Sequence, residues 1–194
     1  SINPGAVDIC GNGIDEDCDG ADLVCPPAND DCSGATAVML GSNAVSNVSA
    51  TVSGVSPAGL PPFVDAATPD TECDFNQDMN ADTWHTFTAP ANGIFLFSTC
   101  DMASYDSKLA IYSGACGAEV PVACNDDGVT CTGFTSELRA TLSSGTDYLV
   151  QVGGFAAASQ GTGTMDISLE SSSGVGTNYC PLTANSAGAG TVMS

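Results

Sequence analysis

Apolar residues in this chain come in short runs that Gly, Asn, Asp and Pro interrupt. Strands are predicted at residues 45–52, 83–88, 94–99, 108–112, 120–123, 137–142, 148–152 and 164–170. In the last of these, Met165, Ile167 and Leu169 alternate with polar residues, which is the period of a strand with one buried face. No segment has sustained helical periodicity. Many short strands with regular turns predict an all-β fold, an antiparallel β-sandwich of jelly-roll-like outline.

Ten cysteines constrain the chain further. Zinc sites use CxxC pairs with histidine partners, but the chain has no CxxC and its one histidine is His85. Disulfides are therefore expected for all ten, in an extracellular or cell-surface setting. Many connectivities are possible. We favour Cys10–Cys18 and Cys32–Cys73, then Cys116–Cys124 as a short hairpin, which leaves Cys100–Cys131 and, by elimination, Cys25–Cys180.

The charge of the chain excludes several partners. Asp and Glu number 23 against 2 basic residues, which gives a net charge of -21. Two cations cannot replace the counterions of nucleic acid or bind an anionic membrane surface. No apolar stretch is long enough for membrane insertion. Because crowded carboxylates repel one another, bound calcium would relieve the repulsion. Solubility in salty water is the alternative explanation.

The composition divides the chain into four parts. Residues 1–26 form a Cys/Asp-rich calcium-binding segment with too few apolar side chains for a core. Residues 27–31 form a linker that prolines stiffen. Residues 32–170 form the β-sandwich domain, and residues 171–194 form a Gly/Ser/Ala-rich tail or linker.

The first candidate metal site is the run Asp15-x-Asp17-x-Asp19-Gly20. Alternate acidic side chains supply the oxygen ligands that calcium prefers, and the glycine permits a sharp turn. An EF-hand would need a glutamate at loop position 12 and flanking helices, and the chain has neither. The pattern predicts a calcium loop of another kind, which Asp22 closes. The alternative is a solvated acidic turn held by a disulfide.

A second candidate has oxygen side chains at alternate positions, namely Asp74, Asn76, Asp78, Asn80 and Asp82. A calcium loop explains this spacing, and so does the wet face of a strand. The sixth position is methionine rather than the glycine of a calcium loop. Both interpretations stay open.

A third candidate is the run Asn125-Asp126-Asp127-Gly128, with Asp106 and Asp101 expected nearby in the fold. The run predicts a turn, because Asn, Asp and Gly favour turn conformations. A metal bound at this turn by Asp106, Asn125, Asp126 and Asp127 is the further hypothesis.

Two runs resemble known families. Residues 10–22 resemble the metal-binding repeat of bacterial surface proteins, of the form C-N-G-x-D-D-D-C-D-G-x-x-D, and depart from it by the extra Gly11. The resemblance implies a metal-binding segment. The sandwich is similar to the bacterial pre-peptidase C-terminal domain through the runs DTWHTFTAP at 82–90, YDSKLAIY at 105–112, CNDD at 124–127, SEL at 136–138, GTDYLVQVGG at 145–154 and GTMDI at 163–167. That resemblance implies a jelly-roll-like, extracellular, non-catalytic accessory domain.

Enzymatic function finds little support. A Ser-His-Asp triad would have to use His85, and the chain has no G-x-S-x-G element. Ser107 and Lys108 are adjacent in a predicted strand, so their side chains point to opposite faces. We therefore expect no catalytic residues.

The hypothesis that follows is a non-catalytic, calcium-binding β-sandwich module. It would act in adhesion or in binding an extracellular glycan or protein ligand, within a larger secreted or surface protein. One alternative is a subunit that self-associates into an extracellular filament or sheath through its unpaired strand edges. A second alternative is an accessory domain of a secreted hydrolase.

Overall fold

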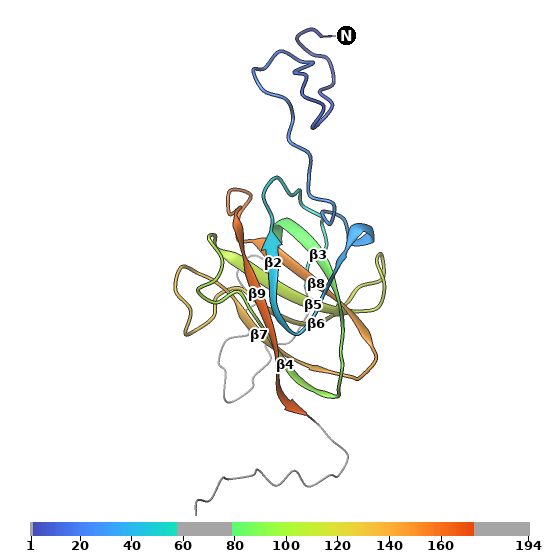
Figure 1. Ribbon diagram of the computed structural model, residues 1–194, viewed down its shortest axis with the longest axis vertical. Helices are drawn as coiled ribbons and strands as arrows, with labels where there is room; N and C mark the ends of the chain where they lie inside the picture. Colours follow the sequence, from blue (N-terminus) through green and yellow to red (C-terminus); the bar gives the residue numbers. More distant parts are fainter. Residues whose placement is uncertain (1, 58–78, 173–194) are drawn as a thin grey trace, which may run out of the picture.

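The computed structural model describes residues 2–57 and 79–172 (Figure 1). Within them, one short 3-10 helix, η1 (Cys32–Gly34), precedes nine strands in two sheets. The strands are β1 (Thr36–Val38), β2 (Gly41–Ser46), β3 (Asn80–Thr88), β4 (Gly93–Ser98), β5 (Ser107–Ser113), β6 (Val120–Asn125), β7 (Glu137–Leu142), β8 (Asp147–Gly154) and β9 (Thr162–Ser172). The predicted all-β sandwich is therefore confirmed.

The two sheets differ in size. The larger has the strand order β1-β3-β8-β5-β6, and the smaller has the order β2-β9-β4-β7. Every pair of neighbouring strands is antiparallel except β1 with β3, which run parallel. Figure 1 shows the two sheets facing each other, with the N-terminal segment projecting from one end of the sandwich.

The core lies between the two sheets. Phe87 of β3 meets Phe95 and Phe97 of β4 in edge-to-face contacts with ring centroids 5.4 and 5.3 Å apart. Ile111, Val150 and other branched residues fill the space around them. The buried residues of each strand alternate with more exposed ones in β4 and β9, as the period-two pattern predicts.

The outer face of the larger sheet is also covered. Trp84 and Tyr112 lie on this face with ring centroids 5.6 Å apart, and Val55 packs against their cluster. Cys32 and Ala35, from the segment around η1, pack against the same cluster. Asn29 fixes this segment to β3, because its carbonyl accepts from the Trp84 amide at 2.8 Å and its side chain donates to the Trp84 carbonyl at 3.1 Å. The sheet is therefore buried on both sides near Trp84.

The predicted strands agree with the observed ones within a few residues, with one exception. The strand expected at 45–52 is instead β2, and it ends at Ser46. Buried Asn47 ends it, because its side chain accepts from the Gly161 amide at 2.7 Å and donates to the Ser159 carbonyl at 2.9 Å. Ser49 then adopts a positive φ of 62°, which lies outside the extended region of regular strand residues. The three-residue strand β1 was not predicted.

The disulfides correct most of the expected pairs. Cys100–Cys131 is confirmed. The other observed pairs are Cys10–Cys25 and Cys32–Cys116, and Cys124 is also disulfide-bonded. The predictions that these replace are wrong, namely Cys10–Cys18, Cys32–Cys73, Cys116–Cys124 and Cys25–Cys180.

The physical reason for these corrections is tertiary proximity. The Gly11 amide donates to the Leu23 carbonyl at 2.8 Å, which folds the first segment back and places Cys10 next to Cys25. Cys18 stays free and exposed, so the expectation that every cysteine is oxidised is wrong at this position. Cys180 and Cys73 lie outside the described residues.

Candidate functional site

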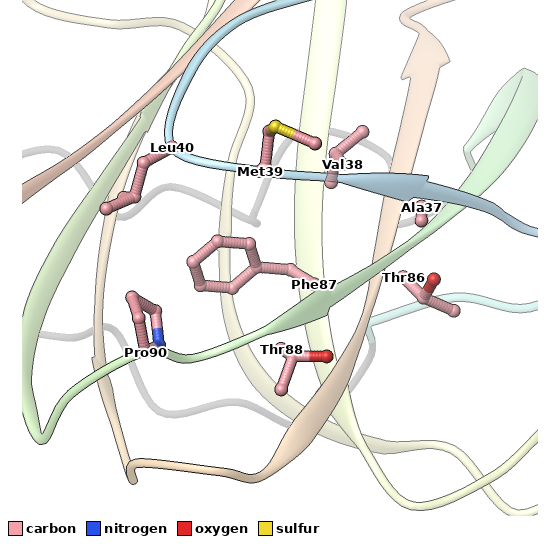
Figure 2. A pocket seen from close by; sticks show the side chains of 8 residues that line it. All are labelled: Ala37, Val38, Met39, Leu40, Thr86, Phe87, Thr88 and Pro90. Carbon is pink, nitrogen blue, oxygen red and sulfur yellow. The ribbon is translucent and has the colours of Figure 1, made fainter.

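An apolar hollow lies at the edge of the larger sheet, between β3 and the connection from β1 to β2 (Figure 2). Its volume is about 390 Å³ and its walls include Val38, Met39, Leu40, Phe87 and Pro90. Figure 2 shows the Phe87 ring between the side chains of Met39, Leu40 and Pro90. Thr86 and Thr88 are its polar lining, and no lining residue is charged. The side chains that line the hollow include no carboxylate, imidazole or thiol to hold a metal ion or act as an acid or base.

The turn after β6 offers different chemistry. Asp106 directly precedes β5, while Asp126 and Asp127 directly follow β6, and β5 and β6 are antiparallel neighbours. The pairing therefore brings the start of one strand next to the end of the other. One oxygen of each of the three carboxylates lies within 4.8 Å of the others. The structure thus brings together three of the four residues in the third predicted metal site.

Asp126 is the most constrained member of this group. It is 4% exposed, and its Oδ1 is buried without a hydrogen-bond partner among the described residues. Its Oδ2 lies 3.4 Å from Nζ of Lys108, a side chain that is also buried. Burial raises the pKa of Asp126 to about 6, against the opposing effect of the Lys108 charge. The charged form of this carboxylate is therefore short of favourable partners.

Asp106 is in a similar situation. Its Oδ1 is buried without a hydrogen-bond partner among residues 2–57 and 79–172. Partial burial raises its pKa, and the charge of Asp127 adds to the effect. Asp127 itself is exposed, so the group opens to solvent on its side.

The backbone around the three carboxylates is held by polar side chains. The Ser136 hydroxyl lies within hydrogen-bond distance of the Ser107 and Asp126 carbonyls. Oδ1 of Asn125 accepts from the Glu137 amide at 2.9 Å, and its Nδ2 donates to the Asp127 carbonyl at 3.2 Å. Asn125 therefore holds the turn that carries Asp126 and Asp127.

Asp101 is not part of the group. Its Oδ1 accepts from the Thr132 amide at 2.7 Å and from the Thr132 hydroxyl at 2.5 Å. These bonds lower the pKa of Asp101. Together with the Cys100–Cys131 disulfide, they fix the loop between β6 and β7.

Two exposed aromatic residues lie in loops that hydrogen-bond to the backbone beside the carboxylates, and the sequence reasoning missed both. Phe155 follows β8, and its amide donates to the Asp106 carbonyl at 3.1 Å. The carbonyl of Phe134 accepts from the Ser107 amide at 3.1 Å. Phe134 is 66% exposed and Phe155 is 38% exposed. Each stands alone in a loop of Gly, Thr, Ser and Ala, and that isolation was the signal that could have found them.

The N-terminal segment holds a second acidic group. One carboxylate oxygen each from Asp8, Asp15 and Asp17 lies within 4.8 Å of the others. Asp8, which the sequence reasoning missed, accepts from the Glu16 amide at 3.0 Å and the Leu23 amide at 2.7 Å. The Glu16 bond is the main cause of its lowered pKa. Asp8 therefore ties the two ends of the segment together.

The other predicted ligands of this segment organise its turns. Asp15 accepts from the amides of Asp19 at 3.1 Å and Gly20 at 2.9 Å. Asp19 accepts from the Ala21 amide at 3.1 Å, and Asp22 accepts from the Gly13 amide at 2.7 Å. Asp19 and Asp22 are thus placed around the group of Asp8, Asp15 and Asp17 rather than in it.

The second predicted metal site falls largely outside the described residues, since Asp74, Asn76 and Asp78 lie there. Its last member, Asp82, is completely buried under the segment that covers the larger sheet. Asp82 accepts from the Ser53 amide at 2.9 Å and from Nε2 of Gln151 at 2.7 Å. Burial raises its pKa. Asp82 therefore anchors the segment around Ser53 and Val55, which covers the outer face of the larger sheet.

His85 is 3% exposed and faces the sandwich interior near β1. Its Nδ1 lies 3.0 Å from the Thr36 hydroxyl. Burial lowers the pKa of His85 to about 4. A side chain so enclosed cannot reach a substrate.

None of the helices in residues 2–57 and 79–172 has the length and apolar character to span a membrane.

Comparison with known proteins identifies the fold family. No curated protein and no solved structure matches the chain. Residues 28–167, more than two thirds of the chain, match the profile of a T9SS-associated family described as galactose binding domain-like. Galactose-binding-like domains are typically non-catalytic binding modules, and T9SS association is typical of secreted or cell-surface proteins. The chain therefore belongs to the T9SS-associated galactose binding domain-like family.

Proposed function

We propose that this chain is a non-catalytic, calcium-binding module that attaches a larger secreted or surface protein to an extracellular ligand. One observation carries the proposal. Asp106, Asp126 and Asp127 converge at one end of the sandwich, and Asp126 is buried with an oxygen that has no partner among the described residues. A buried carboxylate without compensation is costly, and a bound cation removes that cost.

The charges of the group favour a divalent ion. Three carboxylates and the Lys108 ammonium leave two net negative charges, which one Ca²⁺ neutralises. The ligands are all hard oxygens, and the exposed side at Asp127 leaves space for further oxygen ligands. Calcium takes six to eight oxygens in flexible geometry, whereas magnesium demands a near-ideal octahedron. The group suits calcium better.

Replacing Asp126 by asparagine tests this site. We expect Asp126→Asn to weaken calcium binding at the sandwich about 10–100-fold, because the substitution removes the buried charge that faces the ion. Titration calorimetry on the full chain measures the effect. Asp147→Asn, which removes an exposed carboxylate at the other end of β8, should leave the affinity unchanged.

The same measurement at lower pH provides a second check. Calcium affinity should fall as the pH drops below about 6, where Asp126 takes up a proton. Equal calcium affinity in Asp126→Asn and in the unsubstituted protein would show that the sandwich group is not a calcium site.

A second calcium site is proposed in the N-terminal segment, at Asp8, Asp15 and Asp17. Partial burial and the charges of Asp19 and Asp8 raise the pKa of Asp17, against the bond from the Asp19 amide. A cation at this group would relieve that repulsion. The resemblance of residues 10–22 to a metal-binding repeat supports the same site.

Chelation is expected to expose this segment to proteases before the sandwich unfolds. Residues 8–22 have few apolar side chains, and ordering their backbone costs about 1–2 kcal/mol per residue. Limited proteolysis with mass spectrometry, with millimolar calcium or with EGTA, locates the first cuts. Asp17→Ala should reproduce the effect of EGTA, and Asp147→Asn should not. Equal protection of the segment under both conditions would refute the N-terminal site.

The non-catalytic part of the proposal rests on the same observations. His85, the one histidine of the chain, is enclosed in the sandwich, so no imidazole can act as a general base beside the carboxylates. Family membership makes a carbohydrate the leading ligand class. Adhesion is then the role of the module within the larger protein.

A further inference from the structure

We infer that the group of Asp106, Asp126 and Asp127 binds a neutral glycan, whose hydroxyls complete the coordination of the calcium ion while Phe155 and Phe134 contact the sugar rings. The inference rests on the proposed calcium site and names its ligand. It requires three features, namely open coordination positions, apolar surfaces beside them and a charge that selects against acidic sugars.

The coordination positions are open on one side. Asp126 is buried, Asp106 is half-buried and Asp127 is exposed, so the group runs from the protein interior to the surface. With one oxygen from each residue, three carboxylates do not fill the six to eight positions of calcium. Two neighbouring hydroxyls of a sugar are oxygen ligands at a spacing that one ion can accept. A glycan can therefore approach from the Asp127 side and replace water.

Phe155 lies beside these positions. Nζ of Lys108 is 4.8 Å from the centre of the Phe155 ring and 3.4 Å from Oδ2 of Asp126. One ammonium group thus contacts both the ring and the buried carboxylate. A sugar that binds an ion at Asp126 would lie against the exposed part of this ring. Because the C–H faces of a pyranose are apolar, contact with an aromatic ring removes apolar surface from water.

Phe134 is anchored next to the group through the backbone. Its carbonyl accepts from the Ser107 amide, and the next carbonyl, of Thr135, accepts from the Gly128 amide at 2.8 Å. The residue is therefore held between the strand that follows Asp106 and the turn that contains Asp127.

The conformation of Phe134 favours a functional role. Its φ is 58°, a left-handed conformation that is an outlier for a bulky residue and that asparagine or glycine adopts more easily. Its side chain is 66% exposed, so it gains little from packing. A strained, exposed aromatic residue next to three carboxylates is what a ligand contact would require.

Charge selects the class of glycan. The chain carries a net charge of -21, and its two basic residues are already engaged. Lys108 pairs with Asp126, and Arg139 pairs with Glu137 and Glu170. Uronate or sulfate groups would meet repulsion without a basic partner. Neutral sugars, which bind through hydroxyls and C–H faces, avoid this penalty.

The test uses the full chain on an array of neutral and acidic glycans, first with calcium at about 2 mM and then with EGTA. That concentration is above the calcium dissociation constants of about 10⁻⁴–10⁻³ M that are typical of extracellular modules. We expect neutral glycans to bind with calcium and to be lost with EGTA. The strongest neutral glycan on the array is then titrated into variants by calorimetry.

The variants separate the two rings from the ion. Phe155→Leu and Phe134→Asn should each weaken glycan binding at least about 10-fold, the range of aromatic contacts at binding sites, with calcium affinity unchanged. Phe155→Tyr, which keeps the ring, should retain binding. Met39→Ala, which removes an exposed apolar side chain at the other end of β3, should have no effect. Phe134→Asn should also raise Tm, because it relieves the left-handed strain.

Calcium binding without binding of any glycan overturns this inference and leaves the calcium site standing. Absence of calcium binding by the unsubstituted protein overturns the proposed function itself. Binding of acidic glycans only, binding that survives EGTA, or a lower Tm for Phe134→Asn would each contradict the inference.

Discussion

The variant with Cys32→Ser and Cys116→Ser is expected to lose about 4–5 kcal/mol of unfolding free energy. This disulfide joins residues 84 positions apart, so it closes a long loop and removes much conformational freedom from the unfolded chain. It also links η1, before the first strand, to the turn between β5 and β6. The Cys32 side chain packs against the cluster of Trp84 and Tyr112, so the covering of the larger sheet would loosen as well.

Urea denaturation under oxidising conditions, followed by Trp84 fluorescence, measures this effect, since Trp84 is the one tryptophan of the chain. The matched control is Cys10→Ser with Cys25→Ser, which opens a disulfide of sequence separation 15 in the N-terminal segment. That segment hydrogen-bonds mainly within itself, so the control should leave the unfolding of the sandwich nearly unchanged. A loss of less than about 1 kcal/mol in the first variant would contradict the prediction.

Acid is expected to destabilise the sandwich through His85 by about 3 kcal/mol between pH 6.5 and 4. Burial lowers the pKa of His85 from 6.5 to about 4 in the folded protein, while the unfolded chain keeps the ordinary value. Between these two pKa values, the imidazole is protonated in the unfolded state but stays neutral in the folded state. Stability from this group is therefore complete above pH 6.5 and is lost as the pH falls toward 4.

The carboxylates act in the opposite direction. Burial raises the pKa of Asp82 and of Asp126, so these groups favour the folded state as the pH falls. The effect of His85 must therefore be read as a difference between two proteins. His85→Asn keeps a polar atom near the Thr36 hydroxyl and does not titrate in this range.

Urea denaturation in EDTA at pH 7.5 and at pH 4.5 makes the comparison. The unsubstituted protein should lose about 2–3 kcal/mol more than His85→Asn between these two values. Because the chain has one histidine, no other imidazole can produce the difference. Parallel losses in the two proteins would show that His85 is protonated in the folded state as readily as in the unfolded one.

The sequence by itself determined most of the sandwich. The positions of the strands from β3 to β9 could be predicted because each is a short apolar run bounded by turn residues, and in β4 and β9 burial also follows a period of two. Both features are local properties of the chain. The turn at residues 125–128 was also predictable, since Asn, Asp and Gly favour turns wherever they occur. The strand at 45–52 was misplaced because Asn47 is held by Gly161 and Ser159, which lie more than a hundred residues away.

The tertiary structure decided most of the disulfides and which of the predicted ligands come together. Cys32 meets Cys116 because the fold brings η1 against the turn between β5 and β6. Asp106 meets Asp126 because β5 and β6 pair antiparallel, which places the start of one strand beside the end of the other. Asp8 joins Asp15 and Asp17 only after the first segment folds back on itself. Phe134 and Phe155 lie in loops with no periodicity, so only their isolation among small and polar residues marked them in the sequence. Local sequence patterns determine which residues are extended and which face of a strand is apolar. Which side chains come into contact depends on loop closure and on the order of the strands, and both are properties of the whole chain.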